Sequence, residues 1–208
     1  MQEWQADWDI RLDADRAATM RRSGAWHGRV LTDYFNPHAS AHPDRTAIVA
    51  FRGDIGDVVR ISYGQLSCAA DKIALTLRAL GVRRGDIVSF QLPNWWEFLA
   101  VVLGCIKIGA VTHPIMPVLR HRELAFMTRL TGARVLIVPQ RFRGFDFEVM
   151  AREVAAEVPT LRHVFAVGSA DSSFTRQFLG PEGRSHAGGR ASGPGRAHAA
   201  DLHLRHNR

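Results

Sequence analysis

The sequence predicts an α/β protein with a mostly parallel sheet flanked by helices. Two observations predict this class. Short apolar strands alternate with amphipathic helices along most of the chain, and residues 133–138 form a continuous apolar run, which is typical of a strand covered on both faces. The composition of the 208 residues, 46% hydrophobic and 23% charged, is that of an ordinary globular protein and excludes disordered, collagenous and fibrous chains.

The first expected elements are a helix and a hairpin. We expect a lead-in and a short helix within residues 26–41, ended by His42-Pro43. Two short strands follow at residues 47–51 and 58–61, joined by the turn Arg52-Gly53-Asp54. Hairpins of this kind are antiparallel, so this pair is the exception to the parallel pattern.

The clearest helix follows this hairpin. Ser62 is a favourable N-cap, and Gln65 three residues later completes a capping box. Gly81 marks the end of the helix. Its apolar residues recur at helical spacing and predict one buried face: Leu66, Ala69, Ile73, Leu77 and Leu80.

The remaining elements alternate regularly. Gly109 stands where a C-cap glycine belongs and ends the second long helix. The expected strands are at 87–92, 110–115, 133–138 and 163–167, and the expected helices at 95–108, 121–131 and 147–157.

The net charge of +7 does not predict a nucleic-acid binder. Of 27 basic residues, only Lys72 and Lys107 are lysines, a bias typical of a GC-rich genome. Residues 181–208 hold five arginines and two acids, so +3 of the charge belongs to that segment, and the rest of the chain has no clustered basic stripe. We therefore expect no nucleic-acid partner.

Cysteine content and hydropathy predict a cytoplasmic protein without a transmembrane segment. Two cysteines are too few for a disulfide scaffold, and the acidic first twenty residues contain no secretory signal. The longest apolar stretch, residues 98–111, is interrupted by Lys107 and is shorter than a bilayer span.

The residues alone assign no catalytic, cofactor-binding or metal-binding side chain. The sequence lacks Gly-x-Ser-x-Gly, and we interpret Cys68 and Cys105 as small buried helix residues and His113 as a loop histidine satisfied by backbone. The glycines at 188–195 follow no strand and do not predict a phosphate loop. The histidines without metal-ligand spacing are at 27, 38, 42, 113, 121 and 163.

Two clusters allow more than one interpretation. The aromatic group Trp95, Trp96 and Phe98 fits core packing, while a pocket wall or partner surface is the alternative. Arg120 and its neighbours Arg122 and Glu123 fit a solvated helix start.

Residues 26–168 nevertheless resemble the N-terminal part of the AMP-dependent, adenylate-forming acyl-CoA synthetases. The matching strings, in order, are HPDRTAIVAFRGD, ISYGQL, LRALGVRRGDIVSFQLPNWWEFLAVVLGCIKIGAVTHPIMP and RHRELAFMTRLTGARVLIVP. Three strings are most similar to cyclohexanecarboxylate-CoA ligases and short- and medium-chain fatty-acid CoA ligases: QLPNWWEF, PVLRHRELAFM and FRGFDFEVMA.

The resemblance implies a two-step reaction with ATP, magnesium and coenzyme A. A small carboxylic acid is activated as acyl-AMP and then transferred to coenzyme A. The family's phosphate loop, later nucleotide motifs and C-terminal lysine domain have no in-frame counterpart here, so we expect a fragment that is inactive alone. The alternative is a non-catalytic α/β binding or docking module. A fragment should also expose apolar surface, with Trp95 and Trp96 as candidates, and self-associate.

These observations predict three segments. Residues 1–27 form an N-terminal lead-in, residues 28–170 a partial adenylating domain, and residues 171–208 a low-complexity tail that is disordered and read out of frame. Codons permitted for residues 200–208, read one base later, encode Gln-Ile-Tyr-Thr-Ser-Gly-Thr-Thr-Gly, which resembles the family's phosphate loop. We expect the change of frame between residues 172 and 191.

Overall fold

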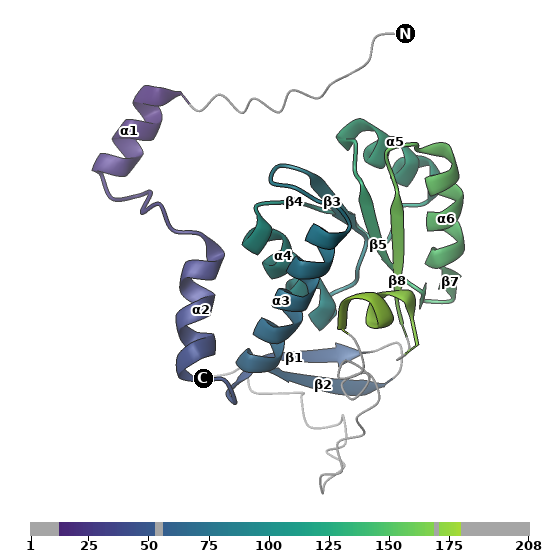
Figure 1. The fold of residues 1–208 in the computed structure, drawn as a ribbon, viewed down its shortest axis with the longest axis horizontal. Coiled ribbons are helices and arrows are strands. Elements are labelled where there is room, and N and C mark those ends of the chain that lie inside the picture. Colours follow the sequence, from purple (N-terminus) through teal and green to yellow (C-terminus); the bar gives the residue numbers. More distant parts are fainter. Residues whose placement is uncertain (1–12, 53–55, 169–170, 180–208) are drawn as a thin grey trace, which may run out of the picture.

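A four-stranded parallel sheet organises the computed structural model, which describes residues 13–52, 56–168 and 171–179 (Figure 1). Its strands lie in the order β4, β3, β5, β8, and every neighbouring pair is parallel. Their bounds are β3 Ile87–Phe90, β4 Val111–Pro114, β5 Val135–Pro139 and β8 His163–Val167. The α/β class predicted from the alternation of strands and helices is confirmed.

Helices cover both faces of this sheet (Figure 1). One face carries α3 (Tyr63–Ala79) and α4 (Trp96–Ile108), and the other carries α5 (His121–Thr131) and α6 (Phe147–Glu157). Strand β5 shows the division directly, because alternate side chains enter opposite cores. Val135 and Ile137 belong to the core beneath α3 and α4, whereas Leu136 and Val138 belong to the core beneath α5 and α6.

The N-terminal part adds two helices and an antiparallel hairpin. Helices α1 (Ala14–Arg22) and α2 (Leu31–Ala41) precede strands β1 (Thr46–Arg52) and β2 (Asp57–Ser62). The hairpin contributes Ala50 and Ile61 to the core beneath α3 and α4. It thus closes one end of that core, next to the start of α3 (Figure 1).

The helix boundaries arise from local chemistry. The Ser62 hydroxyl accepts a hydrogen bond from the Gln65 backbone N–H, and the Gln65 side-chain oxygen accepts one from the Ser62 N–H, at 3.2 and 2.8 Å. This is the predicted capping box at the start of α3. Gly109 ends α4 in the left-handed conformation, which glycine adopts without a Cβ penalty.

Helix α1, a second hairpin and a π-helix are absent from the expectations, which gave residues 1–27 only as a lead-in. A short hairpin, β6 (Arg141–Phe142) and β7 (Phe145–Asp146), follows β5, and the π-helix η1 (Thr175–Leu179) follows β8. In η1, Phe178 packs edge-on against Phe165 with ring centroids 4.7 Å apart. The carbonyl of Leu179 accepts a hydrogen bond from Lys72 on α3 at 3.2 Å.

The tail therefore does not begin at residue 171 as expected. Phe174, Phe178 and Leu179 are buried in the core beneath α3 and α4, since their apolar side chains cover the part of that core next to α3 and β8. The expectations for residues 180–208, including disorder and the phosphate-loop reading, lie outside the described residues.

Three side chains are placed differently from the expectations. Trp95 and Trp96 do not form an exposed patch: each is 5% exposed, because both indoles pack into the core beneath α3 and α4. Cys68 is exposed, because its position on α3 lies outside the buried stripe of that helix, whereas Cys105 on α4 is buried as expected. Burial raises the pKa of Cys105 to about 12. No helix among the described residues has the length and hydropathy to cross a bilayer.

Candidate ligand pocket

The strand order places a crevice at the carboxyl ends of the sheet. The chain leaves β3 to form β4 on one side, and then crosses over to form β5 on the other side. Helix connections that diverge in this way leave a gap outside the carboxyl ends of the two central strands, which is where open α/β sheets bind ligands. A ligand site is therefore expected at the carboxyl ends of β3, β4 and β5.

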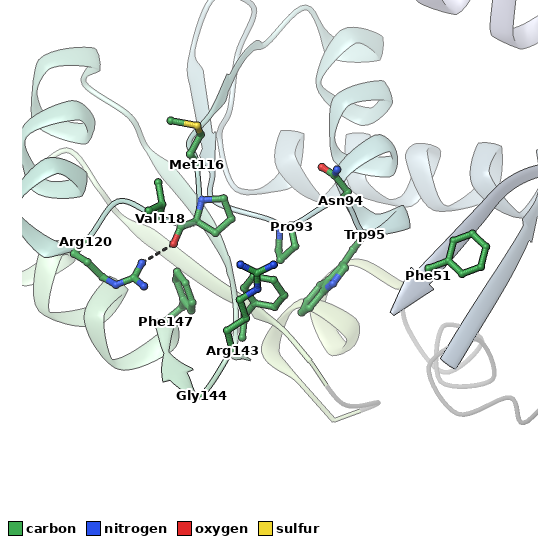
Figure 2. A pocket seen from close by; sticks show the side chains of 12 residues that line it. Phe51, Pro93, Asn94, Trp95, Met116, Val118, Arg120, Arg143, Gly144 and Phe147 are labelled. Atoms are coloured by element: carbon green, nitrogen blue, oxygen red, sulfur yellow. Dashed lines mark hydrogen bonds between the residues drawn. The ribbon is translucent and has the colours of Figure 1, made fainter. Parts of the chain in front are cut away.

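A cavity of about 1010 Å³ lies at this edge (Figure 2). We name it the strand-end pocket. It is formed by the segments that follow β3 and β4, by the β6–β7 hairpin after β5, and by one residue each from β1 and α6. The lining residues are Phe51, Pro93, Asn94, Trp95, Met116, Pro117, Val118, Arg120, Phe142, Arg143, Gly144 and Phe147.

Aromatic rings form one wall of the strand-end pocket. Trp95 and Phe142 meet edge to face, with centroids 5.9 Å apart and an interplanar angle of 87°. Trp95 therefore packs in the core and also lines the pocket. Core packing and the pocket-wall alternative, both considered for the aromatic group, apply together to this residue. Perpendicular rings are a favourable packing arrangement and give the wall a fixed shape.

Guanidinium groups lie against these rings. Arg143 lies over Phe142 at 5.3 Å and Arg52 lies over Trp95 at 3.7 Å, measured from the guanidinium carbon to the ring centroid. Of the described residues that line the strand-end pocket, none is acidic. The pocket is therefore electropositive as well as aromatic, which favours an anion that carries an apolar or aromatic group.

Arg120, Arg122 and Glu123 are exposed, as the predicted solvated helix start requires, and Arg120 also has structural contacts. Its guanidinium lies 4.4 Å from the centroid of the Phe145 ring and donates a hydrogen bond to the carbonyl of Leu119. It donates another to the carbonyl of Pro117 (Figure 2). Its backbone N–H is capped by the Glu123 carboxylate at 3.2 Å. The hydrogen bonds order the segment after β4, and the contact of the guanidinium with the Phe145 ring joins that segment to the β6–β7 hairpin.

Gln91 connects two segments of the chain at the same edge of the sheet. Its side chain is completely buried, and its amide nitrogen donates to the carbonyls of Met116 and Leu119 at 2.9 and 3.0 Å. The end of β3 is thereby tied to the segment after β4. Gln91 was not singled out in the sequence, although a polar residue at the end of an apolar strand is the signal that marks it.

A polar side-chain pair connects β3 and β4. Ser89 and His113 are register partners, and the Ser89 hydroxyl lies 2.8 Å from Nδ1 of His113. Ser89 is fully buried, so its hydroxyl is closed to solvent. His113 lies on β4 and bonds a side chain, unlike the backbone-satisfied loop histidine expected. Burial lowers the pKa of His113, because the imidazolium would lose hydration.

The other histidines are scattered, as their sequence spacing indicates. His121 lies 3.2 Å from Glu157 across α5 and α6, and His163 stacks on Phe165. Among the described residues, no group of three or more histidine, cysteine or acidic side chains is arranged to hold a metal ion. The glycines at 188–195 lie outside the described residues.

The sequence signals for the pocket were weak. Arg143 and Phe142 belong to a hairpin whose strands have only two residues each. They line the pocket only because the segment after β4 lies beside this hairpin. The string FRGF contains a local hint, since glycine is a frequent turn residue.

Comparisons with known proteins agree with this fold. The chain is 38% identical over 155 residues to the 2-hydroxy-7-methoxy-5-methyl-1-naphthoate–CoA ligase of Streptomyces carzinostaticus, covering 74% of this chain and 27% of the relative. It is 39% identical over 159 residues to the salicyl-AMP ligase / salicyl-S-ArCP synthetase of Mycobacterium tuberculosis, covering 76% and 28%. The apo structure of MbtA from Mycobacterium smegmatis superimposes with a TM-score of 0.67 at 30% identity, covering 82% and 31%.

The chain thus spans less than a third of the length of these proteins. The sequence pattern of the AMP-binding enzyme family matches residues 35–200, which is most of the chain. The predicted resemblance to the N-terminal part of adenylate-forming ligases is confirmed at this level. On this match and these identities, the chain belongs to the AMP-binding enzyme family.

Proposed function

We propose that the chain is the N-terminal part of an ATP-dependent acid–CoA ligase. The observation that carries this proposal is the identity of 38–39% to ligases that activate carboxylic acids, maintained over 155–159 residues. The substrate class that we propose is a small carboxylic acid. Cyclohexanecarboxylic acid and short- or medium-chain fatty acids follow from the sequence strings, and aromatic acids are the class named in the two relatives.

The reaction of such a ligase has two balanced steps. The carboxylate of the acid attacks the α-phosphorus of ATP, and pyrophosphate leaves as the acyl-adenylate forms. The thiol of coenzyme A then attacks the acyl carbon, loses its proton, and displaces AMP to give the thioester.

The described residues do not fit ATP or magnesium. The strand-end pocket contains no lysine, serine or threonine among its lining residues, and the described chain offers no metal-binding cluster. We therefore assign no step of the reaction to this chain. It supplies the scaffold of the adenylating domain and is inactive alone.

The test is an ATP–pyrophosphate exchange assay followed by detection of the thioester. The acids offered are cyclohexanecarboxylate, octanoate and salicylate, each with magnesium and coenzyme A. We expect no exchange with the 208-residue chain, and exchange with the protein encoded when the reading frame is restored. Exchange by the 208-residue chain itself would refute the assignment of a scaffold role.

The structure supports a narrower position for the proposed change of reading frame. Phe174, Phe178 and Leu179 are buried, so the sequence specifies apolar core residues up to Leu179. We propose that the out-of-frame segment begins after Leu179. Sequencing the gene and its downstream DNA decides this. If the shifted frame does not continue into a ligase, the proposal is wrong and the non-catalytic binding module becomes the function to test.

A further inference from the structure

We propose that His38 and His42 bind a divalent transition-metal ion of the zinc type at the carboxyl end of helix α2. This inference goes beyond the proposed ligase function. The magnesium of the ligase reaction prefers oxygen ligands, whereas this pair offers two imidazole nitrogens, which suit zinc, nickel and copper.

The first argument is the spacing of the two histidines along the helix. His38 lies in the last turn of α2, and His42 is the C-cap residue four positions later. Residues four apart on a helix face the same side, and two histidines at this spacing are the helix contribution to a familiar type of zinc site. The expected lack of metal-ligand spacing among the histidines therefore does not hold for this pair.

The second argument is the separation of the two rings. The ring centroids of His38 and His42 are 6.5 Å apart, with an interplanar angle of 31°. A zinc–nitrogen bond is about 2.1 Å long and a ring nitrogen lies about 1.2 Å from the ring centre, so two imidazoles on one tetrahedral ion have centres about 5–6 Å apart. Small side-chain rotations of these two exposed residues bring their rings to that separation.

The third argument is that the ring nitrogens are available. Both side chains are exposed, and within the described residues neither imidazole has a hydrogen bond or an ion pair. His121, by contrast, lies 3.2 Å from the Glu157 carboxylate. The contacts of His38 are with rings, since its centroid lies 6.0 Å from that of Tyr63. This contact supports the ring of His38 and leaves its nitrogens open to a ligand.

The fourth argument is the electrostatic position of the pair. The last carbonyls of a helix carry partial negative charge, which favours a cation beside them. The His42 N–H donates to the His38 carbonyl at 2.9 Å, so the backbone between the two ligands is in its last helical turn. An ion shared by the two rings would tie this turn together at the point where α2 leads into the β1–β2 hairpin. Water would complete the coordination, because the protein supplies two ligands here.

Titration of the 208-residue chain with Zn²⁺ at neutral pH, in a buffer without phosphate or chelator, tests the inference. The readout is the ¹H–¹³C signals of the two imidazole rings, each assigned by its loss in His38→Gln or His42→Gln. A readout specific to each residue is needed because the chain has 10 histidines. We expect both signals to shift along one saturable curve. Mg²⁺ at the same concentrations should leave them unchanged, because it prefers oxygen ligands.

Variants of exposed residues separate a shared site from binding by single histidines. His42→Gln should weaken the Zn²⁺ affinity measured at His38 at least tenfold, and His38→Gln should do the same at His42. His27→Gln is the matched control, since it removes an exposed histidine outside α2, and the affinity should stay within twofold of the parent.

A second control tests the spacing itself. Adding Ser40→His to His42→Gln keeps two histidines on α2 but places them two positions apart, where side chains do not face each other. The affinity measured at His38 should therefore remain at least tenfold below that of the parent.

Two results would overturn the inference. One is a pair of unchanged His38 and His42 signals at Zn²⁺ concentrations that saturate free imidazole. The other is a full recovery of affinity in the variant that combines Ser40→His with His42→Gln, which would reduce the effect to the number of histidines. Neither result bears on the ligase assignment, which is decided by pyrophosphate exchange in the frame-restored protein.

Discussion

Replacing Gly104 by alanine tests how closely α3 and α4 pack. A Cβ atom built on Gly104 would lie 2.7 Å from Cγ2 of Ile73 and 3.1 Å from the carbonyl oxygen of Ala70. Ile73 is completely buried and branched at Cβ, and Ala70 offers backbone, so neither neighbour can move alone. The two helices must separate to admit the methyl group.

The magnitude follows from two opposing effects. Alanine is favoured over glycine inside a helix by about 1 kcal/mol, whereas overpacking a filled core costs about 1–3 kcal/mol. We expect Gly104→Ala to lower the free energy of unfolding by up to about 2 kcal/mol, because the clash includes backbone. Urea unfolding followed by circular dichroism measures this change. A gain in stability would refute the close contact between the helices.

A double-mutant cycle identifies the source of the loss. Ile73→Ala removes Cγ2 and leaves room for the new methyl group, so Gly104→Ala in that background should cost less or become stabilising by up to about 1 kcal/mol. An equal loss of stability in both backgrounds would show that Ile73 is not the obstacle.

Four further outcomes are expected. The lowered pKa of His113 means that the unfolded chain binds more protons at and below about pH 6.5. The contribution of His113 to the free energy of unfolding should therefore be constant well above that pH and fall as the pH drops through it, and this fall should be absent in His113→Gln, as measured by urea unfolding across pH. Phe178→Ala should cost about 3–5 kcal/mol by the same method, and an unchanged stability would contradict the packing of η1. Ser62→Ala should cost about 1 kcal/mol through loss of the cap, with helix content followed by circular dichroism. The chain should self-associate in sedimentation velocity, and Phe51→Ser should reduce the association, because Phe51 is 76% exposed.

The long elements could be predicted because their ends carry local signals. Helix α5 begins and ends at the expected residues, since the apolar periodicity starts after Arg120 and Gly132 terminates it in the left-handed conformation. Helix α6 matches the expected 147–157 for a similar reason, with the Asp146 carboxylate accepting a hydrogen bond from the Val149 N–H. Strands β3 and β4 are shorter than expected, because apolar residues continue past the last paired position.

The pocket and η1 could not be predicted because they depend on distant contacts. Arg143 occupies a turn position where the residue preferences favour asparagine or glycine, so the β6–β7 hairpin has no standard sequence signal. Phe174 and Phe178 were not predicted as core residues, because the chain after η1 has a low apolar content and the whole segment was interpreted as a tail. Their burial requires α3 and β8 to be in place.

The contact between α3 and η1 sets an order for folding during synthesis. Lys72 and the Leu179 carbonyl that it binds are 107 positions apart, so at about 5–20 residues per second the ribosome adds the second partner about 5–20 s after the first. Until then, the apolar side of α3 that Phe178 covers is open to water or to a chaperone. A nascent chain released before Leu179 would keep that side uncovered, whereas one extended past it can close the core beneath α3 and α4.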